Sequence, residues 1–95
     1  MPKYALLHVG FAPPGPQDMD RWREWFVSLA PYQADNIGLN PIAKLSDGQE
    51  SPLELDLEAI TGLSIVDTPD EPTALALARA CPSVTACIVS AVREH

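Results

Sequence analysis

The sequence predicts an α+β fold whose elements follow the order βαββαβ. Four segments have the apolar or β-branched content of strands, and two segments between them repeat apolar residues every three or four positions, as amphipathic helices do. Clusters of proline and glycine mark turns between the segments. With 95 residues, the chain is the size of a single domain, residues 1–95, whose hydrophobic core is necessarily thin.

The first strand is predicted over residues 3–9, KYALLHV, because this run is apolar with few polar interruptions. Gly10 and the following APPGP cannot continue a strand ladder or a helix, so they end the run. No small-residue cleavage site follows the apolar stretch, and we therefore expect a strand there and not a secretion signal.

The first helix is predicted between residues 17 and 30. Gln17 or Asp18 can begin it, and Pro31 ends it. Four apolar residues recur at spacings of three and four, which predicts that they form one stripe facing the core: Met19, Trp22, Phe26 and Leu29.

The next segment predicts a second strand and a long connection. Residues 36–45, NIGLNPIAKL, suit an edge strand, because Pro41 lacks the N–H group that a central strand donates. The turn-rich SDGQESP follows. Residues 53–59, LELDLEA, alternate apolar and acidic residues, which indicates either a half-exposed strand or an ordered approach to the next one.

The last two strands are predicted over residues 60–68 and 83–94. The first of these, ITGLSIVDT, has the strongest β-branched content, and Gly62 within it indicates a bulge or the close approach of another backbone or a ligand. The second is apolar enough to be buried on both faces, which predicts a central position in the sheet.

The second helix lies between these strands and has two candidate caps. Thr68 could cap it in a capping box with Glu71, or Asp70 could cap it with Pro72 inside the first turn, and the sequence leaves both open. The helix formers ALALARAC follow, and Pro82 ends the helix.

This order folds most simply as a split βαβ sandwich, with an antiparallel sheet that carries both helices on one face. The first strand places Ala5, Leu7 and Val9 on one side of the sheet, and both sides are largely apolar. A monomer seldom leaves such a surface open, and we therefore expect a homodimer formed through the sheet face that the helices leave uncovered.

The formal net charge of −7, with only six scattered Lys and Arg residues, argues against nucleic acid and against anionic membranes as partners. No apolar run approaches the length of a membrane-spanning helix. Cys81 and Cys87 lie in apolar surroundings and are expected to be reduced core thiols. Together these features predict a cytoplasmic protein.

Three stretches carry a family resemblance: KYALLHVG at the start, WREWF in the first helix, and TGLSIVDTPDEPTALALARACPSV over residues 61–84. They resemble the YCII-related domain family, including its DGPF-type branch. The resemblance implies a ferredoxin-like split sandwich that assembles as a dimeric α+β barrel, and a catalytic His/Asp pair whose histidine lies on the first helix. That helix has tryptophans and no histidine here.

His8 is the candidate general base, because it is the one imidazole away from the C-terminal residue. Asp35, placed where the resemblance implies an acidic partner, is the candidate to orient it. Tyr4 shares a strand face with His8 and could bind a ligand, and Trp25 could form a wall of the same cavity. Each of these residues could instead be packing or turn structure.

Several kinds of chemistry lack support. Ser64 and Asp67 have no second histidine to complete a triad, and no CxxC, HExxH, GxGxxG or P-loop motif is present. We therefore expect no cofactor and no metal. The favoured function is binding of a small organic molecule in a dimer cavity, with cofactor-free proton transfer as its chemistry. The alternative is a non-catalytic dimeric binding or interaction module.

Overall fold

The computed structural model describes residues 2–32 and 34–93. Its elements are β1 (Lys3–Val9), α1 (Asp18–Leu29), the 3-10 helix η1 (Ala30–Tyr32), β2 (Asp35–Gly38), β3 (Ala43–Ser46), β4 (Gln49–Pro52), β5 (Ile60–Asp67), α2 (Glu71–Ala80) and β6 (Ala86–Ala91). The predicted α+β class is confirmed. Among the described residues, no helix combines the length and the apolarity needed to cross a membrane.

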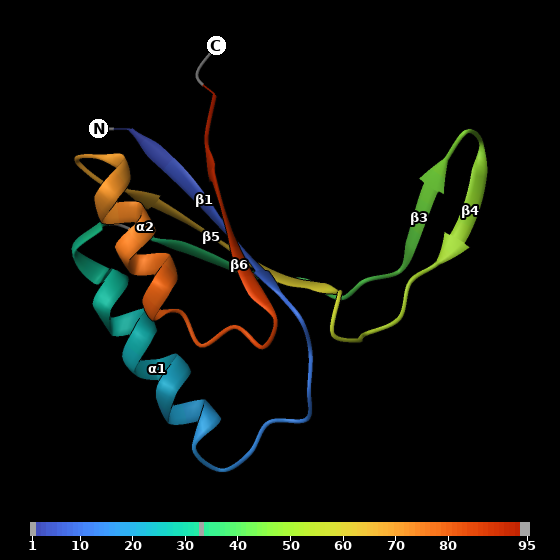
Figure 1. Cartoon of the computed structure of the whole chain (residues 1–95), viewed down its shortest axis with the longest axis horizontal. Helices are drawn as coiled ribbons and strands as arrows, with labels where there is room; N and C mark the ends of the chain where they lie inside the picture. Colours follow the sequence, from blue (N-terminus) through green and yellow to red (C-terminus); the bar gives the residue numbers. More distant parts are fainter. Residues whose placement is uncertain (1, 33, 94–95) are drawn as a thin grey trace.

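The main sheet has four antiparallel strands in the order β2-β5-β1-β6 (Figure 1). The central position of β1 agrees with its apolar sequence. The pairing of β1 with β5 shifts between His8, opposite Gly62, and Val9, opposite Ile60. One extra residue, Thr61, therefore bulges from β5, which confirms the irregularity that Gly62 predicted.

Both helices cover one face of this sheet. Leu6 of β1 and Val66 of β5 are fully buried against Trp25 and Leu29 of α1, and Leu77 of α2 packs against the same cluster. Figure 1 shows α1 and α2 side by side over the strands. The core thus lies between the sheet and the two helices, as the βαββαβ order predicted.

The other side of the sheet has no cover in the described chain. Alternation along the strands and the pairing register place the following apolar side chains there, and we call this surface the open face: Ala5, Leu7, Val9, Ile37, Leu63, Ile65 and Ile88. Ile37 and Ile88 each remain 48% exposed. Such a contiguous apolar surface is unusual on a monomer.

The single strand predicted over residues 36–45 is wrong. It divides at Leu39–Ile42, beside Pro41, into β2, which joins the main sheet, and β3, which pairs only with β4. The β3–β4 hairpin projects away from the sheet and helices as an arm (Figure 1). Residues 53–59 connect the arm to β5 without forming a strand.

The prediction of a central last strand is also wrong. β6 pairs only with β1 and lies at the edge of the sheet, where Ile88 is half exposed. Apolar residues on both faces of a strand predict burial of both faces, but one face of β6 belongs to the open face.

The helices begin and end close to where the sequence predicted. Asp70 is the cap of α2, since its carboxylate accepts a hydrogen bond from the backbone N–H of Thr73, and the Thr68 hydroxyl instead donates to the Asp70 carbonyl. In α1 the predicted stripe is only partly right. Leu29 is buried as predicted, but Met19 is 62% and Phe26 39% exposed, and the buried tryptophan is Trp25, which the predicted stripe did not include.

Candidate functional site

A cavity of about 480 Å³ lies between the start of α1 and the main sheet. Most of its wall is apolar and includes Phe11, Met19, Trp22 and Phe26. Its polar lining groups are His8 of β1, Asn36 of β2, and Thr61 and Ser64 of β5. None of the described residues that line it is Lys, Arg, Asp or Glu. Pockets of this size and composition accept small organic molecules.

His8, Ser64 and Asn36 form a hydrogen-bonded relay on the floor of this cavity. The Ser64 hydroxyl donates to the Asn36 side-chain oxygen at 2.6 Å and lies 3.0 Å from His8 Nε2. Since the hydroxyl has one proton and gives it to Asn36, it accepts from His8, and Nε2 therefore carries the ring proton. His8 and Ser64 are 5% and 0% exposed, so these groups depend on one another for partners.

The other ring nitrogen of His8 faces two further polar side chains. Nδ1 lies 3.3 Å from the sulfur of Cys81, directly after α2, and 3.4 Å from the hydroxyl of Ser83. With the proton on Nε2, Nδ1 is an acceptor in the neutral ring. Cys87 of β6 pairs with His8 in the sheet, and its sulfur lies within 4.8 Å of a His8 ring nitrogen and of the Cys81 sulfur.

The two thiols titrate as a pair. Hydrogen bonding from Cys87, with a smaller contribution from Ser83, lowers the pKa of Cys81 to about 4 against the effect of burial. The same contact with Cys81, together with burial, raises the pKa of Cys87 above its ordinary value. The pair therefore loses its first proton easily and keeps the second, with the negative charge on Cys81.

Two tryptophans hold the imidazole ring in place. The rings of Trp22 and Trp25 each meet the His8 ring edge to face, with centroids 5.2 Å apart in both cases. Trp25 is fixed in turn because its indole N–H donates to the carbonyl of Leu77 on α2. The ring is thus held by both helices as well as by the sheet.

Asp35 does not lie beside His8. It pairs with Ile65, one position from the Asn36–Ser64 pair, and neighbouring residues of a strand point to opposite faces. The Asp35 side chain is therefore on the open face, whereas His8 is on the helix face. The residue that contacts the Nε2 side of His8 is Ser64, so the predicted His8–Asp35 pair is wrong.

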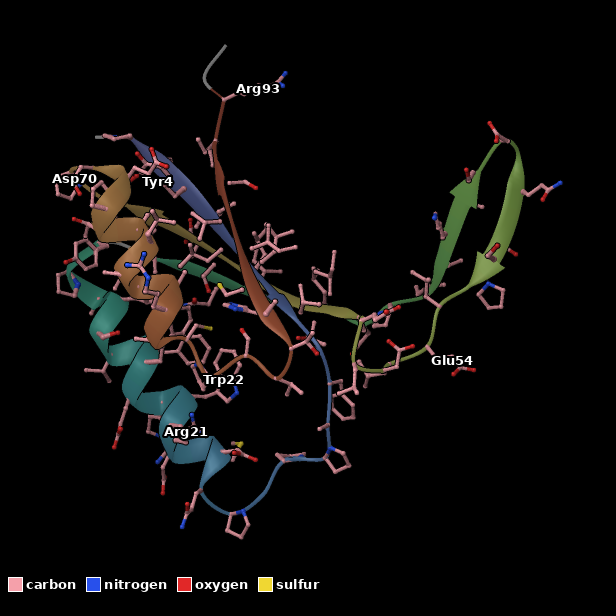
Figure 2. All side chains as sticks on the ribbon, in the orientation of Figure 1. Tyr4, Arg21, Trp22, Glu54, Asp70 and Arg93 are labelled. Carbon is pink, nitrogen blue, oxygen red and sulfur yellow. The ribbon has the colours of Figure 1, made fainter. Side chains whose placement is uncertain are left out.

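Tyr4 and Trp25, which were predicted to bind a ligand, do not line the cavity. Tyr4 shares the helix face with His8, but four residues of strand separate them by about 13 Å, and Figure 2 shows Tyr4 at the far end of β1 from Trp22. Trp25 is only 4% exposed and belongs to the core. Trp22, predicted as core, is the tryptophan that lines the cavity.

Four residues around His8 were not predicted from the sequence: Asn36, Cys81, Ser83 and Cys87. Ser64 was predicted only not to form a triad. The pairing register brings Cys87 to His8 and Asn36 to Ser64, and no local pattern specifies that register. One signal was available: Cys81 ends a helix and Cys87 begins the next strand, so a short connection keeps the two thiols close.

Comparisons of this chain with protein-family models, with curated proteins and with solved structures found no match.

Proposed function

We propose that this protein binds a small, uncharged, mainly apolar organic molecule that carries a carbonyl group, in the cavity between α1 and the sheet. The cavity itself is the observation that carries the proposal: about 480 Å³ of space, apolar walls, and a few polar groups gathered on one side. A binding site with these features buries the apolar body of a ligand and orients it through its polar end.

The carbonyl requirement follows from the direction of the relay. The Asn36 side-chain oxygen is occupied by the Ser64 hydroxyl, so the Asn36 amide N–H groups are the donors that remain for a ligand. The absence of any Lys or Arg from the described lining argues against a carboxylate ligand, which would lose its hydration without gaining a cation.

The chemistry that the relay supports is polarisation of a carbonyl group by Asn36, with a changed role for His8. Because Nε2 donates and Nδ1 faces Cys81, His8 is not placed to remove a proton from a molecule in the cavity. It does not supply one either, because the Ser64 hydroxyl proton is donated to Asn36 and the neutral ring has no proton to spare. The Asn36 amide, held by the relay, would stabilise charge that develops on a carbonyl oxygen, as an enolising or isomerising reaction requires, and water would take the C–H proton that is released.

The binding proposal can be tested with acetophenone and two compounds of similar shape. Ethylbenzene lacks the carbonyl oxygen and benzoate is charged. We expect acetophenone to quench the fluorescence of Trp22 and to shift the NMR signals of the Asn36 side-chain amide, with weaker effects from the other two. Asn36→Leu should weaken acetophenone binding several-fold, whereas Asn40→Leu, outside this cavity, should not. Equal binding of acetophenone and ethylbenzene would contradict the proposal.

We also propose that two copies of the chain pair through their open faces, as in a dimeric α+β barrel. The order β6-β1-β5-β2 is that of a ferredoxin-like sandwich if the β3–β4 arm is treated as an insertion. This order and the apolar open face support the YCII-related resemblance and the dimer. The two free cysteines fit a reducing compartment such as the cytoplasm.

Sedimentation equilibrium tests the dimer directly. Ile88→Lys places a charge on the open face and should shift the protein toward monomers. Val27→Lys makes the same change on the exposed side of α1 and should leave the dimer unchanged. A wild-type protein that stays monomeric at high concentration would contradict this proposal and would leave the cavity of the single chain intact.

A further inference from the structure

Three potential metal ligands meet at one point of the core, behind the His8 ring as seen from the cavity. His8 comes from β1, the Cys81 sulfur from the end of α2 and the Cys87 sulfur from β6; a ring nitrogen of His8 and the two sulfurs lie within 4.8 Å of one another, and Nδ1 is the nitrogen next to Cys81. We propose that these residues bind a zinc ion, with three protein ligands and a fourth position open to water or another small ligand.

The spacing of the donor atoms suits zinc with small adjustments. A tetrahedral ion with Zn–S bonds of about 2.3 Å and Zn–N bonds of about 2.0–2.1 Å holds its nitrogen and sulfur ligands roughly 3.5 Å apart and its two sulfurs roughly 3.8 Å apart. The distance from His8 Nδ1 to the Cys81 sulfur is 3.3 Å. The separations that involve the Cys87 sulfur are at most 4.8 Å, so movements of up to about 1 Å in the thiol groups would admit the ion.

The relay prepares His8 for this role. A histidine that binds a metal through one nitrogen usually donates from the other to a fixed acceptor, which sets the tautomer and the direction of the free lone pair. His8 Nε2 donates to Ser64, and Ser64 is held by Asn36. The lone pair of Nδ1 is thus directed toward the two sulfurs without any metal being required to orient it.

Ser83 marks the fourth position. Its hydroxyl lies 3.0 Å from the Cys81 sulfur and 3.4 Å from His8 Nδ1, so it contacts two of the three atoms that would share the metal. It could hydrogen-bond a water molecule on the ion. Sites with three protein ligands and one exchangeable ligand are typical of catalytic zinc, whereas structural zinc sites use four protein ligands.

The choice of zinc rests on the donor types. Thiolate sulfur and imidazole nitrogen are poor ligands for Mg²⁺ and Ca²⁺, which require oxygen. The spacing of the three ligands matches none of the local zinc motifs, because the sheet and the end of α2 bring them together. The expectation of no metal therefore relied on local motifs alone.

Cobalt provides a spectroscopic test. Reduced, EDTA-treated protein titrated with Co²⁺ should develop the strong d–d bands of a tetrahedral ion and thiolate-to-cobalt charge-transfer absorption, saturate at one ion per chain, and lose both signals when Zn²⁺ is added. X-ray absorption of the zinc form should show two sulfur ligands at about 2.3 Å. Zinc should also slow the reaction of both thiols with an aromatic disulfide reagent.

Variants assign the ligands. Cys81→Ser and Cys87→Ser should each reduce the charge-transfer absorption by about half, as expected for one of two thiolates, and together should abolish it. Ser64→Ala, which frees His8 Nε2, should weaken zinc binding about 10–100-fold. Glu54→Gln, in the acidic segment after the arm, should change nothing. Circular dichroism of each variant establishes that it is folded.

Two results would overturn the zinc proposal. One is a weak, octahedral cobalt spectrum that persists in the Cys81→Ser, Cys87→Ser double variant. The other is loss of binding on Glu54→Gln, which would place the ion in the acidic segment. Neither result bears on the cavity proposal, because acetophenone binding is measured on metal-free protein.

Discussion

Gly62→Ala tests whether close packing between two strands holds His8 in position. A methyl group added at Gly62 would lie 3.1 Å from His8 Cδ2 and 3.2 Å from the backbone oxygen of Ile37, both closer than the roughly 3.5–4.0 Å of an unstrained contact. Overpacking of this kind costs about 1–3 kcal/mol. The reduced freedom of alanine in the unfolded chain offsets about 0.4–1 kcal/mol of that cost.

The net expectation is a loss of about 1–2 kcal/mol in the free energy of unfolding, which corresponds to a urea midpoint lower by about 1 M. The ring of His8 has little room to move, because Ser64 and the two tryptophans surround it. We therefore expect Gly62→Ala to displace the His8 ring slightly. This displacement should change the chemical shifts of the ring in NMR spectra and weaken its hydrogen bond to Ser64.

Gly38→Ala is the matched control. Gly38 pairs with Gly62 across β2 and β5, and a methyl group there would meet no atom within 4 Å. This variant should be as stable as the wild type or slightly more stable. If Gly62→Ala and Gly38→Ala have the same urea midpoint, the contact with His8 is not tight and the reasoning is refuted.

Three further predictions concern the relay, the thiols and a helix cap. Ser64→Ala leaves the buried N–H group of His8 without its acceptor and should cost about 1–3 kcal/mol in urea unfolding. The exposed Ser90→Ala should cost less than about 0.5 kcal/mol, and equal costs would contradict the relay. In metal-free protein, the rate at which iodoacetamide alkylates Cys81 should stay nearly constant as the pH is lowered from neutral, until the pH nears the Cys81 pKa of about 4. Mass spectrometry of the peptides measures that rate, and a rate that rises in proportion to hydroxide across the neutral range would contradict the lowered pKa. Asp70→Ala removes the cap of α2 and should lower the thermal midpoint more than Glu71→Ala does. Hydrogen bonding to Thr73 lowers the pKa of the Asp70 carboxyl from 3.8. The loss in thermal midpoint caused by Asp70→Ala should therefore be full above pH 3.8 and should shrink as the pH falls through the lowered pKa. A loss that does not change with pH would contradict the cap.

Elements with strong local signals could be predicted from the sequence. β1 and β5 are apolar or β-branched runs bounded by turn residues, and α2 has a cap, helix formers and a closing proline. The sequence of the arm also contains a hairpin signal, although only a turn-rich loop was predicted at SDGQESP. Asp47 and Gly48, with φ of 52° and 74°, are the central residues of the turn between β3 and β4, and Asp-Gly is a typical hairpin pair.

The site could be predicted only in part. His8 was identified because an imidazole is rare in this chain, but its partners depend on which residues face each other across the sheet. A shift of one residue in the β1–β5 register would exchange Ser64 for a residue of the open face. Asp35 and Asn36 are neighbours in the sequence, and only the register decides that Asn36 faces the helices.

The arm has a consequence for how the protein is assembled. None of the residues in its two short strands is buried, and Ile42 at its base is 82% exposed. A two-stranded ribbon with no apolar side covered is marginal in water, so the arm would gain order wherever a second copy of the chain covers it. If the proposed dimer covers the arm, diluting the protein should accelerate amide hydrogen exchange in residues 43–52 well before exchange in β1 or β5 changes.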